Sequence, residues 1–344
     1  MLAPDAPEDV ADAQRWLFLD TETTGLAGGT GTYPFLVGLG WWEGGGLEVE
    51  QLFMREYSEE PSLLAALAER LAERPVLITF NGKSFDWPLL ETRYRMTRTI
   101  PPPAPRAHLD FLHPARSLWR LRLGSVKLSQ LERHVLGWDR GADLASELIP
   151  RIYLDFVRGG RADALVPVFH HNQMDLRGLA GLSSRILTLL GDEEASGQDG
   201  LEVYGVSRIC ERRGERKRAR KLYERSIGSA LPLETDRAAR TALARLAKRD
   251  GDLARSRELW ESTRGNSREG YEAYEQLAIY YEHEAREPQQ ALAVAREALA
   301  QLRRANQAGT IAAAAYRRTK ARFEHRLLRL ERKVGRTLLD ALDT

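Results

Sequence analysis

The arrangement of apolar and polar residues differs between the first 190 residues and the rest of the chain. In the first part, short apolar runs bounded by turn residues predict strands, and longer amphipathic stretches predict helices. The predicted strands are residues 16–20, 32–42, 47–54, 75–80 and 107–112, and the clearest helices are residues 61–73, 126–137, 148–160 and 164–190. Pro167 is a candidate break in the last helix. This order of strands and helices predicts a mixed α/β layer rather than a doubly wound dinucleotide-binding fold.

The second part of the chain contains helical patterns only. Residues 191–200, GDEEASGQDG, hold one apolar residue, Ala195, and therefore predict a linker. Three later segments can be laid over one another as helix, polar turn and helix, at residues 205–227, 242–263 and 273–300. Their spacing is near the 34-residue period of tetratricopeptide repeats, with a generic helical bundle as the alternative. The expected organisation is a flexible lead (1–14), an α/β domain (15–190), the linker and an all-α repeat domain (201–344).

Composition adds limited information about partners. The chain has 344 residues with 43% hydrophobic residues and a net charge of +2, so two soluble domains are expected. The first 190 residues are mildly acidic and the remainder is mildly basic, which suits either nucleic acid or a solvated helical surface. The single cysteine, Cys210, excludes a disulfide framework and a cysteine-based zinc site. The start of the chain does not resemble a signal peptide and no apolar run is long enough for a membrane, so a cytoplasmic protein without membrane contact is expected.

Two acidic residues end the first predicted strand. Asp20 and Glu22 lie one residue apart, so both side chains point to the same face of the sheet. No lysine or arginine lies beside them in the sequence. The pair alone is a common pattern, and its meaning depends on whether other carboxylates reach the same place.

Further acids follow at suitable positions. Asp86 comes after the next buried strand, in the first turn of a helix, where a carboxylate also suits the helix dipole. His171 and Asp175 lie four residues apart on one face of a predicted helix that is otherwise expected to be core. A buried aspartate is costly unless it is paired or bound to a metal. Four oxygen-donor acids without cysteine favour Mg²⁺ or Mn²⁺, and they can hold two such ions for an in-line phosphoryl displacement.

The order of these motifs resembles that of the DEDD (DnaQ-like) exonucleases of the ribonuclease H-like fold. Within that superfamily, three segments look like the YprB-like ribonuclease H-like domain, which a tetratricopeptide-type tail can follow: LDTETTGLAGGTGTYPFLVGLG, VKLSQLERHVLGW and HNQMDLRGLAGL. The resemblance covers about residues 14–190. It implies an α/β ribonuclease H-like domain with a mixed central sheet flanked by helices.

The resemblance also implies roles for individual residues. Asp20, Glu22, Asp86 and Asp175 would be metal ligands, and His171 would be the general base. His170 is the alternative base, since it has the four-residue gap to Asp175 that the histidine-type branch shows. Helical geometry can place only one of the two histidines beside Asp175.

Several nearby residues are candidates for contact with substrate. Thr23, Thr24 and Gly25 lie where the related enzymes hold a terminal nucleotide, although they also suit a tight turn. The loop of residues 28–31 could cradle a phosphate through its backbone. Asn81 and Lys83 either touch substrate or order their loop.

Three other features carry expectations of their own. Phe85 is expected in the core, and Asp110 is a candidate fifth acid. The basic run of residues 211–221 suits a solvated turn or a path for a phosphate backbone.

The expected function is that of a metal-dependent nuclease. A 3′→5′ exonuclease on single-stranded DNA or RNA is favoured, with the repeats binding a protein partner or guiding the substrate. Two alternatives remain: a protein-interaction scaffold whose nuclease-like domain mainly binds nucleic acid, and a structure-selective endonuclease.

Overall fold

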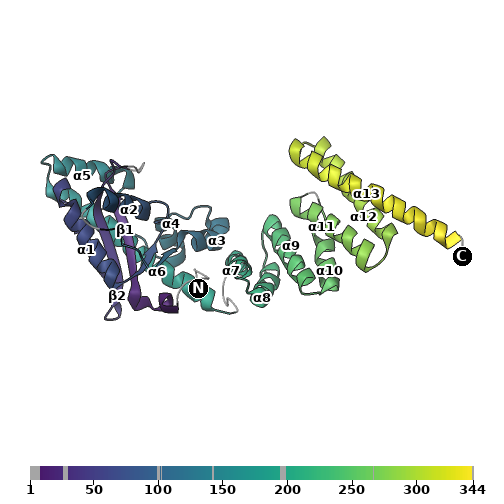
Figure 1. The fold of residues 1–344 in the computed structure, drawn as a ribbon, viewed down its shortest axis with the longest axis horizontal. Coiled ribbons are helices and arrows are strands. Elements are labelled where there is room, and N and C mark those ends of the chain that lie inside the picture. The colour runs from purple at the N-terminus through teal and green to yellow at the C-terminus, as the bar shows by residue number, and fades with distance from the viewer. Residues whose placement is uncertain are drawn as a thin grey trace. The chain divides into compact units, whose positions relative to one another are not determined.

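The chain divides into two compact units, residues 1–195 and 196–344 (Figure 1). The computed structural model describes residues 8–25, 30–98, 101, 103–141, 143–193, 199–265 and 267–342. Of the expected linker, residues 194–198 lie outside this description. Within the described residues no helix is both long enough and apolar enough to cross a membrane.

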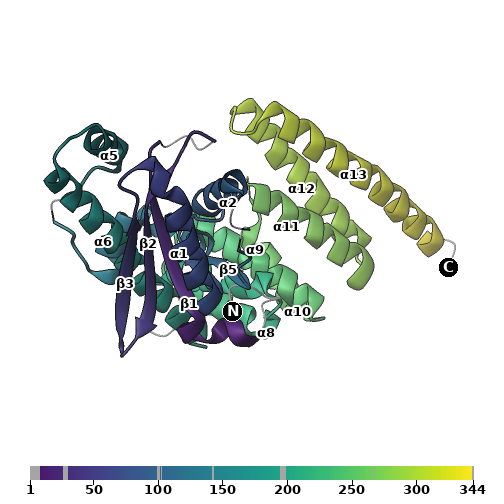
Figure 2. The ribbon, with the colours of Figure 1, turned by 60° about the vertical axis from the view of Figure 1, so that its left-hand side comes forward.

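A five-stranded sheet forms the centre of the first unit. Its strands are β1 (Trp16–Thr23), β2 (Pro34–Glu43), β3 (Gly46–Phe53), β4 (Val76–Thr79) and β5 (Ala107–Asp110). They lie in the order β3-β2-β1-β4-β5 (Figure 2). The β1–β2 and β2–β3 pairs are antiparallel, whereas β1, β4 and β5 run parallel. The mixed sheet predicted from the sequence is therefore confirmed, and its parallel strands place their carboxyl ends at one edge.

The hairpin between β2 and β3 turns at two glycines. Gly44 and Gly45 have φ angles of 58° and 86°, which side chains rarely tolerate and glycine adopts without strain. The final predicted strand is shorter than expected, since β5 ends at Asp110 and a helix begins at Leu112. Asp110 accepts the Leu112 backbone N–H at 3.0 Å, which favours the turn at that point.

Helices cover the sheet. The helices of the first unit are α1 (Glu60–Glu73), α2 (Asp86–Thr97), α3 (Leu112–Leu123), α4 (Leu128–Leu131), α5 (Ile149–Val157) and α6 (Val166–Gly191), with a π-helical turn at Glu132–Leu136. Pro167 does not break the last helix, because it lies in its first turn, where the missing N–H of proline has no intrahelical partner. Helix α6 packs on β1, β2 and β3. The core includes Phe35, whose ring stacks on Tyr153 of α5 with ring centroids 3.9 Å apart.

Residues 8–15 differ from the expected flexible lead. They form 3₁₀ turns at Glu8–Ala11 and Ala13–Arg15. The Val10 side chain is buried, and its carbonyl accepts a hydrogen bond from Trp16 Nε1 at 2.8 Å. Burial of this valine and the bond from Trp16 hold the segment against the start of β1.

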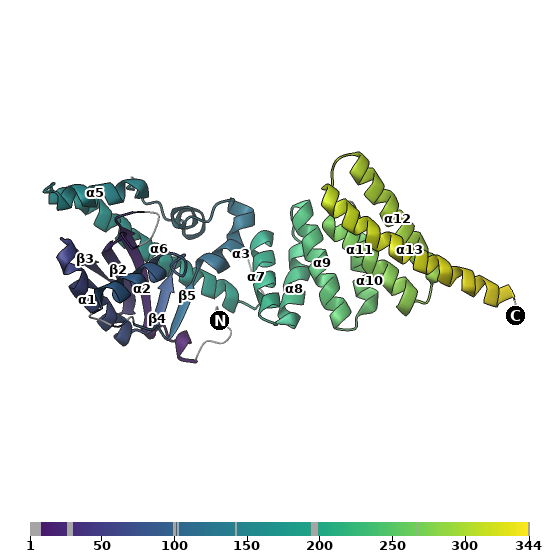
Figure 3. The ribbon, with the colours of Figure 1, turned by 45° about the horizontal axis from the view of Figure 1, so that its top comes forward.

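The second unit contains only helices among its described residues (Figure 3). They are α7 (Gly200–Arg212), α8 (Arg216–Ile227), α9 (Leu233–Arg249), α10 (Leu253–Thr263), α11 (Arg268–Ile279), α12 (Pro288–Gln307) and α13 (Ala313–Leu342). Helices that follow one another pack together, as in the pairs α7–α8, α9–α10 and α12–α13. Gly214 and Gly251, at φ angles of 78° and 82°, lie in the turns of the first two pairs. The all-helical character predicted for this region is confirmed.

The basic run of residues 211–221 crosses the turn between α7 and α8. Arg213 and Arg218 form ion pairs with Glu215 at 2.8 and 3.3 Å, and Arg220 pairs with Asp252 at 2.8 Å. Three cations of this run are therefore paired with acids of the same unit.

Candidate metal centre

The end of β1 carries the first two acids of the site. Asp20 is paired in register with Gly38 of β2, and Glu22 with Leu36. Burial raises the pKa of Asp20 well above its ordinary value, and the charges of Asp175, Glu22 and Asp86 raise it further. Burial, followed by Asp175 and Asp86, raises the pKa of Glu22 to about 8. These shifts show that several carboxylates share a small, poorly solvated space.

The third acid comes from the start of α2. Asp86 occupies the first turn of that helix, and Thr21 Oγ1 donates a hydrogen bond to Asp86 Oδ1 at 2.6 Å. Burial raises the pKa of Asp86, while the bond from Thr21 opposes the shift. This bond ties Asp86 to β1, and the charge of Asp86 acts on both Asp20 and Glu22.

Asp110, the candidate fifth acid, acts on Asp86 through its charge and binds the loop that precedes it. Its oxygens accept backbone N–H groups from Asn81 at 2.8 Å, Lys83 at 3.1 Å and Leu112 at 3.0 Å. Asn81 adopts a φ of 71°, a conformation that asparagine tolerates better than most residues. Asp110 therefore shapes the loop that leads to Asp86.

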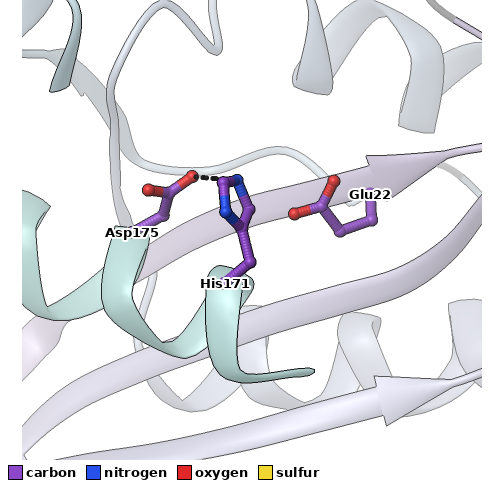
Figure 4. Close-up of side chains that lie close together, drawn as sticks. All are labelled: Glu22, His171 and Asp175. Atoms are coloured by element: carbon purple, nitrogen blue, oxygen red, sulfur yellow. Dashed lines mark ion pairs between the residues drawn. The ribbon is translucent and has the colours of Figure 1, made fainter. Parts of the chain in front are cut away.

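Helix α6 brings the remaining predicted residues to the site. One ligand atom from each of Glu22, His171 and Asp175 lies within 4.8 Å of the others (Figure 4). His171 Nε2 lies 3.6 Å from Asp175 Oδ2, and Figure 4 shows the imidazole between the two carboxyl groups. His171 is buried, whereas His170 is exposed. The helix therefore presents one histidine to the acids, and it is His171.

Asn172 fastens α6 to the sheet. It is completely buried, donates from Nδ2 to Asp20 Oδ2 at 2.8 Å, and accepts at Oδ1 from Gln51 Nε2 at 2.9 Å. Asp20, Gly38 and Gln51 occupy one row across β1, β2 and β3. A Cβ on Gly38 would lie 2.2 Å from Asn172 Oδ1, so glycine is what allows the helix to approach this closely.

Two charged residues of the loop before α5 also reach the site. Arg140 pairs with Asp175, with Glu132 of the π-helical turn and, at 3.0 Å, with Asp143. Asp143 lies 2.8 Å from His171 Nδ1. Neither loop residue was expected from the sequence, because the loop has no periodic pattern and its partners lie about thirty residues away.

The predicted substrate contacts have mixed outcomes. Thr23 Oγ1 donates to the Gly25 carbonyl at 2.8 Å, and Thr24 Oγ1 accepts the Tyr33 N–H at 3.0 Å, so both hydroxyls already serve a tight turn. Gly28 and Gly29 of the proposed phosphate loop lie outside the described residues. Lys83 is exposed. The expectation that Phe85 lies in the core is wrong, because the residue is 61% exposed at the start of α2, next to Asp86.

A divalent cation suits the donors gathered here. Within the described part of the chain, no lysine or arginine forms an ion pair with Asp20, Glu22 or Asp86. The raised pKa values of these acids reflect repulsion and burial that a divalent cation would offset. Carboxylate oxygens are the ligands that hard divalent ions such as Mg²⁺ and Mn²⁺ prefer.

The sheet and the acids at its edge define a class of protein. The chain belongs to the ribonuclease H superfamily, whose family model matches residues 17–187, a span that contains all four acids and His171. Membership of this superfamily indicates a nuclease, which binds nucleic acid and hydrolyses phosphodiesters with divalent metal ions.

The chain also has a particular relative among known proteins. The chain is 32% identical over 285 residues to "Uncharacterized protein YprB" of Bacillus subtilis (strain 168). The match covers 82% of this chain and 68% of that protein. The predicted resemblance is thus confirmed for the superfamily and for the likeness to YprB, while the DEDD subtype and the tetratricopeptide character remain predictions.

Proposed function

We propose that this protein is a 3′→5′ exonuclease that removes nucleotides from single-stranded nucleic acid by two-metal hydrolysis. The proposal rests on one observation above all. Glu22, His171 and Asp175 offer ligand atoms within 4.8 Å of one another, and the charges of Asp86 and Asp175 act on both Asp20 and Glu22. Asp20, Glu22, Asp86 and Asp175 would hold two Mg²⁺ or Mn²⁺ ions, which supply charge stabilisation for the attacking and leaving oxygens.

His171 is suited to accept the proton of the attacking water. Its Nε2 lies 3.6 Å from Asp175 Oδ2 and its Nδ1 lies 2.8 Å from Asp143 Oδ1, so the nitrogen on the side of Asp175 is available as the base. His170 is exposed and has no such surroundings. We therefore assign the base to His171.

Two exposed side chains flank the third acid and could receive the strand end. Phe85 offers an aromatic face on which a base can stack, an interaction that tolerates any sequence. Lys83 is an exposed cation two residues earlier and suits a phosphate. Stacking requires an unpaired base, which favours single-stranded ends over duplex.

The helical unit is proposed as a tetratricopeptide-like repeat domain that binds a protein partner or guides the substrate. The support is its construction from successive antiparallel helices with glycine turns at Gly214 and Gly251. A scaffold role in addition to catalysis is compatible with that construction.

A cleavage panel tests the proposed activity. Single- and double-stranded DNA and RNA, each labelled at one end, are incubated with the full-length chain and Mn²⁺ or Mg²⁺, together with an internally labelled circular single strand. The expected result is release of labelled mononucleotides from the 3′ end and an intact circle. Cleavage of the circle would instead indicate an endonuclease, and stable binding of all substrates without cleavage would indicate a scaffold.

A further inference from the structure

His171 has a specific partner on the side away from the acids. The residue is 7% exposed, and Nδ1 lies 2.8 Å from Asp143 Oδ1. An ionised carboxylate can only accept a hydrogen bond, so in the neutral imidazole Nδ1 carries the proton. The lone pair then resides on Nε2, which lies 3.6 Å from Asp175 Oδ2 and 3.5 Å from Ser146 Oγ.

Arg140 donates a hydrogen bond to the second carboxylate oxygen of Asp143. Its Nη1 donates to Asp143 Oδ2 at 3.0 Å, while its Nη2 reaches Asp175 Oδ1. The Arg140 side chain is only 6% exposed and is also paired with Glu132, whose side chain is 1% exposed. A guanidinium has donors and no acceptor, so both oxygens of Asp143 are held in accepting roles. One buried cation thus fixes the acid that faces Nδ1 and the acid that faces Nε2.

We propose that Asp143 is a positioning residue that sets the Nδ1–H tautomer of His171, with Arg140 fixing the orientation of Asp143. The catalytic part of this inference rests on the proposed function, whereas the tautomer itself does not. Through Asp143 and Arg140, the loop between the π-helical turn and α5 decides which nitrogen of His171 is available to the site.

Two substitutions at Asp143 separate this role from simple charge pairing. In Asp143→Asn, Arg140 attracts the amide oxygen, so the amide NH₂ must face His171 Nδ1 and force the proton onto Nε2. In Asp143→Ala, neither tautomer is imposed. The expected loss in kcat is about 10²-fold or more for the asparagine variant, and smaller for alanine, with little change in KM for either. Asp139→Asn, in the same loop but exposed, is the matched control and should retain wild-type activity.

Nitrogen-15 NMR of histidine-labelled full-length protein reads the tautomer without any substrate or metal. The signal of His171 among the seven histidines is assigned from its loss in His171→Gln. At alkaline pH the wild type should show the Nδ1–H form, and Asp143→Asn should show the Nε2–H form.

The two readouts fail in different ways. A wild-type Nε2–H tautomer, or an asparagine variant at least as active as the alanine variant, would overturn the inference. If the wild type cleaves no substrate, the proposed function fails, and the NMR comparison still decides the tautomer.

Discussion

Asn172 Nδ2 donates a hydrogen bond to Asp20 Oδ2 at 2.8 Å, across 152 positions of sequence. This contact joins α6, which carries His171 and Asp175, to the strand that carries Asp20 and Glu22. It exists because Gly38 leaves room for Asn172 above β2. The geometry of the metal centre therefore depends on a residue without a side chain.

Gly38→Ala should separate the helix from the sheet. The new methyl group would meet the Asn172 amide, so we expect a loss of about 1–3 kcal/mol in the free energy of unfolding and weaker Mn²⁺ binding. Chemical denaturation and metal titration measure both. Gly40→Ala is the matched control on the same face of the same strand, because its nearest contact would be an ordinary 3.5 Å to Phe18 Cβ. Equal effects of the two variants would refute the role assigned to Gly38.

The metal-free protein should lose stability as the pH rises between about 4.5 and 8. The pKa of Glu22 is raised from its ordinary value of 4.5 to about 8, so across this interval the folded state holds a proton that the unfolded state has released. In EDTA at pH 8, Glu22→Gln should therefore unfold with a free energy at least about 1 kcal/mol higher than that of the wild type. Added Mn²⁺ should reverse this order, because the wild type gains more from binding.

Thermal melts across pH, with and without Mn²⁺, test this prediction. The exposed Glu48→Gln on β3 is the control and should follow the wild type in both conditions. If the stability of the wild type in EDTA rose between pH 4.5 and 8 relative to that of Glu22→Gln, the pKa of Glu22 would not be raised in the folded protein. That result would contradict the claim that the acids repel one another without a metal ion.

Arg140→Met should be strongly destabilising. Removing the cation leaves Glu132 buried without its partner and frees the Asp175 oxygen that Arg140 holds, so we expect a loss of about 3–5 kcal/mol. The double variant Glu132→Gln/Arg140→Met should recover part of this loss, since it no longer buries an unpaired Glu132 charge. Urea denaturation measures the free energy of unfolding of both variants. A double variant less stable than Arg140→Met would show that the unpaired charge of Glu132 is not the cause of the destabilisation.

Phe85→Ala should weaken substrate binding without affecting the fold. Phe85 is 61% exposed, so removal of its ring should cost little stability. Loss of one stacked base should raise KM about tenfold on single-stranded substrates. Leu121, 52% exposed on α3, supplies the control variant Leu121→Ala. Steady-state kinetics compare the two, and unchanged KM in Phe85→Ala would remove the stacking role.

Local patterns in the sequence were sufficient to predict the strands and the acids at their ends. Alternation with period two places Asp20 and Glu22 on one face of a strand, and helical spacing places His171 and Asp175 on one face of a helix. Each pairing can therefore be predicted from the local sequence alone. The preference for His171 over His170 came from the resemblance, and the structure adds its physical reason, since His171 is buried against the acids and His170 is exposed. Arg140, Asp143 and Asn172 could not be predicted in this way, since their roles come from contacts between distant segments.

Two interpretations from the sequence illustrate the same limit. Phe85 is apolar, yet it is exposed at the start of α2, after a loop whose backbone N–H groups are bound by Asp110 of a different strand. Asp110 ends a strand beside the site as a metal ligand would, yet backbone N–H groups occupy its oxygens. In both cases the contacts with distant segments, which local patterns do not contain, determine the environment of the side chain.

The central claim is that the acids at the end of β1 hold the metal ions required for hydrolysis. The most direct measurement is the initial rate of nucleotide release as a function of Mn²⁺ concentration, for the wild type, Asp20→Asn and the exposed control Asp155→Asn. We predict no release in EDTA, saturable activation of the wild type and the control, and a loss of about 10²–10³-fold in Asp20→Asn. Undiminished release in EDTA, or an Asp20→Asn variant as active as the wild type, would contradict the account.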